Sequence, residues 1–217
     1  MAAPPGPVTL DQINDADRAE LKRLAKDCRV VIDVGTFLGG SAEAMLEAMP
    51  ADGILLTLDI FEGASGTQTE FAYKNPAAIY AYATARLSRF GGRCCIGKGR
   101  SVELAKTVLP GIADLVFIDA AHDYANCLAD IHAWLPKVKA DGWMAGHDFD
   151  QLWAVDMDQK EITRRSEQDW DAESGAHCGV IRAVMDSFAK VEHAPDQKSS
   201  IWRARPQWHR QFKQEVA

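Results

Sequence analysis

No two of the five cysteines form a C-x-x-C pair, and their number is odd. Both facts argue against a disulfide framework and against a structural zinc site built on paired thiols. Scattered thiols of this kind fit a reducing compartment, so we expect a cytoplasmic protein.

The sequence also lacks long apolar runs and an excess of positive charge. No run approaches the roughly 18–20 apolar residues of a membrane span, and residues 1–7 contain neither a basic residue nor the apolar core of a signal peptide. The net charge of −7 argues against a nucleic acid, which would favour a basic surface. We therefore expect a small-molecule partner and no role for a nucleic acid or a membrane.

The G-x-G-x-x-G signature of dinucleotide-binding folds is missing as well, but another glycine turn is present. The apolar, β-branched run from Val30 predicts a strand buried on both faces. It leads into a G-x-x-x-G-G turn, at the end of which Ser41 is a candidate cap for a helix. Strand, glycine turn and helix in this order present backbone N–H groups to a ligand in open parallel sheets. The three glycines are Gly35, Gly39 and Gly40.

Strands and helices alternate along the chain, which predicts an α/β fold: a Rossmann-like, doubly wound, mostly parallel seven-stranded sheet with helices on both faces, in a single domain. We expect residues 1–9 to be disordered and residues 10–217 to form the domain. Strands are expected at 30–34, 54–59, 94–97, 114–119, 142–146, 191–194 and 201–204, the last two as an antiparallel pair. Helices are expected at 11–26, 42–49, 76–90, 102–108, 124–138 with a kink at Pro136, and 180–188. Loops are expected at 61–75, as a mobile lid, and at 149–178, where the alternative is a partly helical segment.

Four of the expected strands end in an aspartate. The carboxyl ends of parallel strands lie on one edge of the sheet, and ligands bind outside that edge. Each acid by itself could cap a turn or a helix, whereas four on one edge favour a binding site. The four are Asp33, Asp59, Asp119 and Asp148.

The second of these acids indicates a nucleoside. Asp59 follows Gly35 by 24 residues, and an acid near this spacing typically accepts both hydroxyls of a ribose. The segment that follows the third strand would then lie near the base; it comprises Gly99, Arg100 and Ser101.

The segment Asp33–Ser41 resembles the first motif of class I S-adenosylmethionine-dependent methyltransferases. It is especially similar to the catechol and caffeoyl-CoA O-methyltransferase group, in which acid-x-Gly-Thr-aromatic-x-Gly-x-Ser recurs. The segment Ile118–Tyr124 resembles that group's motif after the fourth strand, and His147-Asp148 stands where the group has an Asp-Asn pair. The last two motifs also resemble a broad bacterial methyltransferase family of largely unassigned substrates. The resemblance covers about residues 30–188 and implies S-adenosyl-L-methionine as cofactor.

The resemblance also implies residue roles. In that group an Asp after the fourth strand binds a divalent metal, and a Lys three residues later is the general base. Asp119 matches this Asp, while His122 replaces the Lys, and imidazole is a good base near neutral pH. With the ribose argument, the expected cofactor-binding residues are Asp33, Gly35, Thr36, Phe37, Gly39, Ser41, Asp59, Ile60, Gly99, Arg100, Ser101 and Asp119.

Three residues are expected to hold the metal: Asp119, His147 and Asp148. Carboxylates suit Mg²⁺, whereas a neutral imidazole ligand from His147 would suit Mn²⁺, Fe²⁺, Ni²⁺ or Zn²⁺ better. Consecutive strand residues point to opposite faces, so His147 and Asp148 can share an ion only if the chain has turned, and Gly146 permits that turn. The other interpretation of His147 is a residue that caps this turn.

The expected function is that of an S-adenosylmethionine-dependent O-methyltransferase acting on a hydroxyl of a small molecule, assisted by a divalent metal, Mg²⁺ or Mn²⁺. A metal would lower the pKa of the hydroxyl and fix its position. The alternatives are a metal-independent methyltransferase with His122 as base, an NAD-dependent oxidoreductase and a catalytically silent binding domain. The missing G-x-G-x-x-G signature argues against the oxidoreductase.

Some weaker signals have a structural and a functional interpretation. We interpret His177 as a surface residue rather than a substrate contact. The basic segment 203–213 is interpreted as a solvated surface or the edge of a homodimer. Aromatic residues of the long loops are more often local packing than walls of an acceptor pocket; they are Tyr73, Phe149, Trp153 and Trp170.

Overall fold

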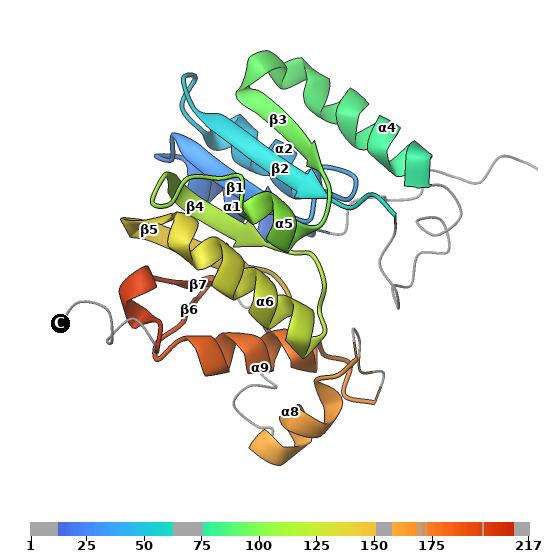
Figure 1. Ribbon diagram of the computed structural model, residues 1–217, viewed down its shortest axis with the longest axis vertical. Coiled ribbons are helices and arrows are strands. Elements are labelled where there is room, and N and C mark those ends of the chain that lie inside the picture. Colours follow the sequence, from blue (N-terminus) through green and yellow to red (C-terminus); the bar gives the residue numbers. More distant parts are fainter. Residues whose placement is uncertain are drawn as a thin grey trace, which may run out of the picture.

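The computed structural model describes residues 13–62, 76–150, 158–168, 171, 173–196 and 198–210. At its centre is a seven-stranded sheet in the order β3-β2-β1-β4-β5-β7-β6 (Figure 1). The strands are β1 (Val30–Val34), β2 (Ile54–Asp59), β3 (Cys94–Lys98), β4 (Ala113–Ile118), β5 (Val138–Gly146), β6 (Glu192–His193) and β7 (Trp202–Ala204). β1 to β5 are parallel, and β7 pairs antiparallel with β5 and β6. The doubly wound, mostly parallel sheet and its late antiparallel pair are thereby confirmed.

Helices cover both faces of this sheet (Figure 1). One face carries α1 (Asp15–Ala25) and α2 (Gly40–Ala48), with α4 (Pro76–Leu87) beside α2. The other carries α5 (Ser101–Ala105), α6 (Tyr124–Trp134) and α9 (Cys178–Ser187), with α8 (Gln159–Arg165) against α9. Short 3₁₀ helices are η1 (Ser88–Arg93), η2 (Leu135–Lys137) and η3 (Pro206–Trp208).

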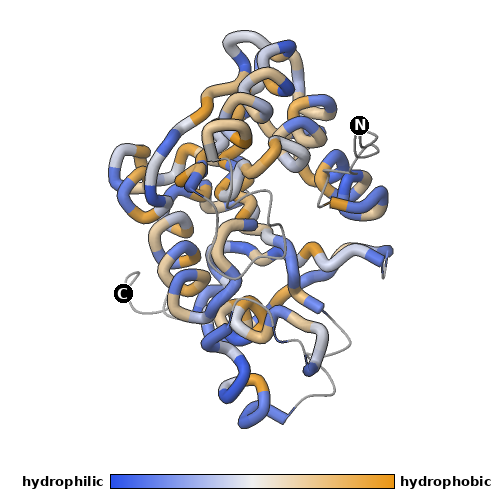
Figure 2. Tube along the Cα trace, turned by 90° about the vertical axis from the view of Figure 1, so that its right-hand side faces the viewer, coloured by the Kyte–Doolittle hydropathy of each residue, from blue (hydrophilic) through white to orange (hydrophobic). Residues whose placement is uncertain are grey.

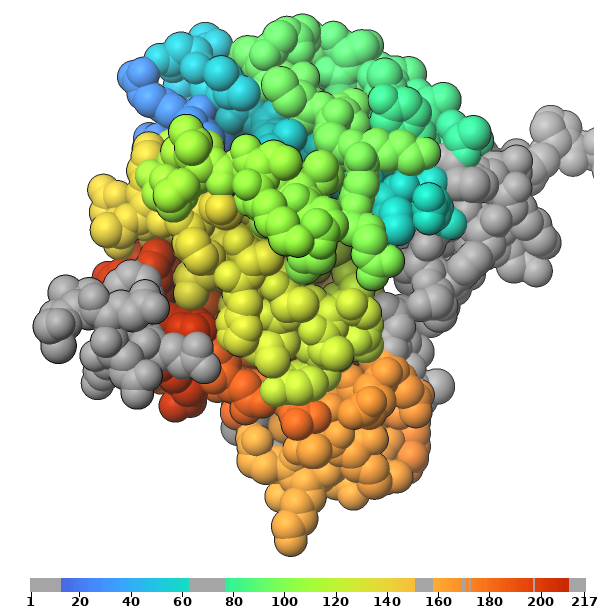
Figure 3. All heavy atoms as spheres, in the orientation of Figure 1, coloured from blue at the N-terminus to red at the C-terminus, as the bar shows by residue number. Residues whose placement is uncertain are grey.

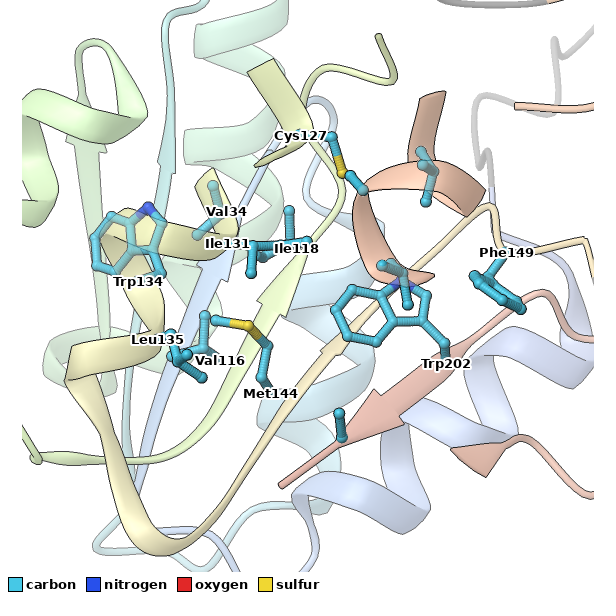
Figure 4. Packing of buried hydrophobic residues seen from close by; sticks show 14 of the residues in the cluster. Val34, Val116, Ile118, Cys127, Ile131, Trp134, Leu135, Met144, Phe149 and Trp202 are labelled. Carbon is cyan, nitrogen blue, oxygen red and sulfur yellow. The ribbon is translucent and has the colours of Figure 1, made fainter. Parts of the chain in front are cut away.

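The central strands are mostly apolar because both of their faces are buried. In β1, Val34 shares a cluster with Trp134 of α6 (Figure 4). Ile32 belongs to the same cluster, whereas Val31 packs with Leu21 of α1. Burial of a side chain of this size contributes about 1.5–3 kcal/mol. Figure 2 shows the hydropathy of the whole trace, with many hydrophilic residues on the outer helices. Successive side chains of each strand point alternately to the two faces of the sheet. This alternation fixes the register of the strands and therefore the residues at which they end.

Several expected boundaries were wrong. The first helix begins at Asp15, with Asn14 as its N-cap in a capping box with Asp17. α6 ends at Trp134 and does not continue through a kink, because Pro136 lacks the N–H that the next turn would need. β5 begins at Val138, earlier than expected.

The segment after β5 is partly helical, which is the alternative that the sequence left open for it. It contains α8, and the residues around α8 and α9 form one end of the molecule in Figures 1 and 3. The expected lid lies almost wholly outside the described residues, as do residues 1–9, Tyr73, Trp153 and Trp170. Phe149 is described and buried, in contact with His193, so local packing is the correct interpretation for it.

Candidate functional site

The turn after β1 depends on two glycines with positive φ. Gly35 has a φ of 109°, and a Cβ there would lie 1.9 Å from the backbone oxygen of Asp119. Gly39, with a φ of 81°, is the N-cap of α2, and among the described residues no side chain caps this helix. The first N–H groups of α2 therefore lack a side-chain acceptor, and the positive end of the helix lies at the carboxyl edge of the sheet.

We expected Ser41 to cap α2, and this prediction was wrong. Ser41 belongs instead to a buried hydrogen-bond network. Its hydroxyl donates to Oδ2 of Asp33 at 3.2 Å, and the Thr57 hydroxyl donates to the same oxygen at 2.7 Å. Thr36 Oγ1 lies 2.6 Å from Thr57 Oγ1. All four side chains are buried, so Asp33, Thr36 and Ser41 stabilise the turn from inside the fold, and their role in binding a cofactor stays a prediction.

The carboxyl group of Asp33 is an unusual member of this network. Burial raises its pKa to about 7, although the hydrogen bonds from Thr57 and Ser41 act in the opposite direction. The negative charges of Asp119 and Asp59 add to the rise. The acid nearest to the glycine turn therefore titrates near neutral pH.

Asp59, at the end of β2, accepts hydrogen bonds from two turns in which a phenylalanine has a positive φ. Its Oδ2 accepts the N–H of Phe37 at 2.8 Å and its Oδ1 accepts the N–H of Phe61 at 2.7 Å. Both phenylalanines have positive φ, 44° and 52°. Each carboxylate oxygen has a second lone pair, so the partly exposed Asp59 can still accept ligand hydroxyls.

Among the residues expected to bind the cofactor, Ile60 and Gly99 lie next to this acid. Ile60 follows it directly, and Gly99 donates its N–H to the backbone oxygen of Asp59 at 2.9 Å. Arg100 is exposed and precedes α5 as its N-cap. The Ser101 hydroxyl accepts the indole N–H of Trp134 at 2.7 Å, so this side chain is engaged with α6.

A second group of residues lies at the ends of β4 and β5. Asp119 follows β4 and donates its N–H to the backbone oxygen of Val34 at 2.7 Å. Asp148 follows β5 by two residues with a φ of 60°, and its N–H donates to Oγ of Ser200 at 3.1 Å. The turn that brings His147 and Asp148 to one place is thus made at Asp148. Gly146, which we expected to make it, is needed for close packing, because a Cβ there would lie 2.7 Å from the Trp202 indole nitrogen.

The side chains of this second group converge on Asp148. His122 Nε2 lies 3.1 Å from Asp148 Oδ2 and 3.6 Å from Asp119 Oδ1. His147 Nδ1 lies 2.9 Å from Asp148 Oδ1 and 3.9 Å from Asp119 Oδ1. The exposed fractions of the four side chains lie between 13% and 20%, so each is largely enclosed and still reachable. The structure therefore brings together all four residues expected to hold a metal or to act as base.

Two further residues belong to this group, and the sequence argument missed them. His177 Nδ1 lies 3.4 Å from Asp148 Oδ1, and its ring centre lies 4.7 Å from that of His122, so interpreting it as a surface residue was wrong. A Cβ on Gly179 would lie 2.2 Å from the backbone oxygen of His122, which explains how α9 approaches so closely. Asp17 of α1 places Oδ2 3.1 Å from His147 Nε2. Asp17 lies one helical turn before Leu21, an apolar residue of the same helix. This spacing places Asp17 on the apolar face and could have indicated that it is buried.

The group is electrostatically self-consistent. Burial alone would lower the pKa of His147, but the charges of Asp148 and Asp119 outweigh it and raise that pKa well above the ordinary value. Burial alone would raise the pKa of Asp148, but His147 and His122 hold it well below the usual range. Two neighbouring carboxylates require a positive charge between them, which a protonated imidazole or a metal ion can supply.

The donor atoms form two sets that could hold a divalent cation, within the described residues. One consists of Asp119, His147 and Asp148, and the other of His122, Asp148 and His177. The first set, two carboxylates and one imidazole, is the predicted one. Its oxygen-rich composition fits Mg²⁺ or Mn²⁺, and the imidazole favours Mn²⁺.

A family model described as a methyltransferase domain matches residues 32–149. This stretch is more than half of the chain and contains the glycine turn, Asp59 and the group around Asp148. The chain belongs to this methyltransferase family. His177 and Asp17 lie outside the matched stretch. No curated protein matches the chain.

Solved structures share the methyltransferase's fold at low sequence identity. The O-methyltransferase TomG of Streptomyces achromogenes, from tomaymycin synthesis and in complex with SAM, is 19% identical with a TM-score of 0.59, covering 88% of this chain and 79% of that chain. A Bacillus cereus O-methyltransferase in complex with SAH is 16% identical with a TM-score of 0.61, covering 91% and 84%. A putative caffeoyl-CoA O-methyltransferase of Staphylococcus aureus is 13% identical with a TM-score of 0.60, covering 90% and 86%.

One further finding concerns membranes: among the described residues, no helix has both the length and the apolar character that a membrane span requires.

Proposed function

We propose that this methyltransferase transfers the methyl group of S-adenosyl-L-methionine to a hydroxyl of a small molecule, with a divalent cation at Asp119, His147 and Asp148. The observation that carries the proposal is the contact between the two halves of the site. A Cβ on Gly35 would overlap the backbone oxygen of Asp119, so the glycine turn and the acid–histidine group are immediate neighbours. A cofactor on the turn and an acceptor at the histidines would therefore meet.

The cofactor side rests on the residues around the turn. The uncapped N-terminus of α2 suits the carboxylate of the methionine moiety, and Asp59 suits the ribose hydroxyls. TomG and the Bacillus cereus enzyme were solved with SAM and SAH, respectively, which supports the same cofactor here. The missing G-x-G-x-x-G signature speaks against the NAD-dependent alternative.

The acceptor side needs a base. In the transfer, the acceptor oxygen forms a bond to the methyl carbon while the carbon–sulfur bond breaks, and the hydroxyl proton must leave. His122 takes that proton at Nε2, the atom that faces Asp119 and Asp148. A bound divalent cation would lower the pKa of the acceptor hydroxyl. His147 and Asp148 would fix the position of that cation, and the enclosure of the group would keep water away.

A metal-independent methyltransferase is the second candidate, and one observation favours it. The pKa of His147 is raised by Asp148 and Asp119, so a protonated imidazole can neutralise the acid pair without any ion. In that case His122 acts alone as the base.

The test is methyl transfer to a panel of hydroxylated small molecules before and after exhaustive chelation, with calorimetric titration of S-adenosylhomocysteine and of NAD. Binding of S-adenosylhomocysteine and turnover that is lost on chelation and restored by Mn²⁺ at least as well as by Mg²⁺ are expected. Full turnover after chelation would favour the metal-independent mechanism. Binding of NAD without binding of S-adenosylhomocysteine would overturn the proposal.

A further inference from the structure

Asp17 is a buried carboxylate far from the matched motifs. It lies in the first turn of α1 and its side chain is 1% exposed. Its Oδ2 accepts the N–H of Asn14 at 3.2 Å and lies 3.1 Å from His147 Nε2. Burial of a carboxylate is costly unless it is paired, and here the partner is an imidazole of the proposed metal site.

The ring of His147 links Asp17 to the acid pair. Nε2 faces Asp17, while Nδ1 faces Asp148 at 2.9 Å and Asp119 at 3.9 Å. A carboxylate beside Nε2 of a histidine favours the proton on that nitrogen, which leaves the lone pair at Nδ1 and favours one orientation of the ring. Asn14, the N-cap of α1, also donates its side-chain amide to the backbone oxygen of Lys198 at 3.1 Å, an exposed contact.

We propose that Asp17 is a positioning residue that holds His147 with Nδ1 directed at a divalent cation on Asp119 and Asp148. The inference builds on the proposed function, from which it takes the cation, and it adds the nitrogen ligand and the residue that orients it. A carboxylate behind a ligating histidine raises the basicity of that ligand and favours borderline ions such as Mn²⁺ over Mg²⁺.

The capping box of α1 is a competing explanation for Asp17, since a capping residue also stabilises the helix. The chain offers a matched control for this role. The Asn14 side chain accepts the N–H groups of Ala16 and Asp17 at 2.8 and 3.0 Å, and has no part in the contact with His147. Asn14→Ala therefore weakens the cap, whereas Asp17→Ala weakens the cap and also removes the partner of His147.

The experiment measures Mn²⁺ binding to the full-length chain by electron paramagnetic resonance, with Mg²⁺ as competitor, and no turnover is needed. Asp17→Ala is expected to weaken Mn²⁺ binding by about 10–100-fold, the usual effect of losing such a supporting partner, and to weaken Mg²⁺ binding less. Asn14→Ala is expected to bind Mn²⁺ like the wild type. Thermal unfolding of both variants measures how much stability the loss of the cap costs.

The outcomes separate the inference from the proposed function. Wild-type protein without Mn²⁺ or Mg²⁺ binding would overturn the proposed cation, and the inference with it. Wild-type binding that Asp17→Ala leaves unchanged would overturn the inference alone, and so would an equal loss in Asn14→Ala. If Asp17→Ala does not fold, Asp17→Asn is compared in its place: it keeps an acceptor and lacks the charge, and its Mn²⁺-to-Mg²⁺ preference is expected to fall.

Discussion

The buried carboxyl group of Asp33 makes the stability of this methyltransferase depend on pH in a way that one substitution should remove. Its pKa is raised from 3.8 to about 7 by burial. Between these values the folded chain keeps a proton that the unfolded chain has released. The folded state therefore binds more protons, and the free energy of unfolding contributed by this group falls as the pH rises through the window.

The magnitude follows from the pKa values. Since a shift of one pKa unit corresponds to 1.36 kcal/mol, the folded protein loses roughly 2 kcal/mol of stability through Asp33 between pH 5 and pH 7, and a few tenths of a kcal/mol more by pH 8. Asp33→Asn has no titrating group but keeps an oxygen that can accept from Thr57 and Ser41. The stability of this variant relative to the wild type should therefore rise by roughly 3 kcal/mol between pH 5 and pH 8.

The assay is urea unfolding of both proteins at pH 5 and pH 8 in the presence of a chelator. Ser41→Ala is the control: it removes a donor that favours the charged form, so it should cost more stability at pH 8 than at pH 5. An equal stability difference between wild type and Asp33→Asn at the two pH values would refute the reasoning.

The remaining predictions concern the cofactor and the reaction. Asp59→Ala should weaken S-adenosylhomocysteine binding by about 1.5–3 kcal/mol, the worth of charge-assisted hydrogen bonds, and calorimetry showing full affinity in a folded variant would exclude the ribose role. Asp119→Ala and Asp148→Ala should abolish metal-dependent turnover and leave S-adenosylhomocysteine binding largely intact; loss of both in parallel would indicate a folding defect instead. His122→Ala should lower turnover by roughly 10²–10⁴-fold, as removal of a general base does, and wild-type turnover numbers would rule the base out.

The glycine turn and the order of elements follow from the sequence, because they depend on local chemistry. Gly35 and Gly39 adopt positive φ values that other residues rarely adopt, and β1 is apolar apart from Asp33 because both of its faces are covered. The aspartates that follow β4 and β5 could be assigned to one edge, because parallel strands end together. The boundaries of α1 and α6 were less predictable, since caps and the end of a helix depend on a few neighbouring groups.

The burial of individual side chains and the direction in which they point could not be predicted from the sequence. Asp33 belongs to the first motif, yet only the packing of α2 and β2 against it shows that its carboxyl group is buried. The approach of the His147 side chain to that of Asp148 likewise depends on a positive φ at Asp148, which is not a glycine. A hydrogen bond from the Asp148 N–H to Oγ of Ser200 helps to hold this backbone conformation.

The sequence by itself determined the fold, the family and the edge of the sheet at which the site lies, because periodicity, glycines and strand-end acids are local signals. Only the tertiary structure decided which residues complete the site. Asp17 comes from the first described helix and lies against His147, whereas His177 comes from the start of α9 and lies against Asp148. Contacts between segments so distant in the chain are set by how helices pack, which no local pattern records.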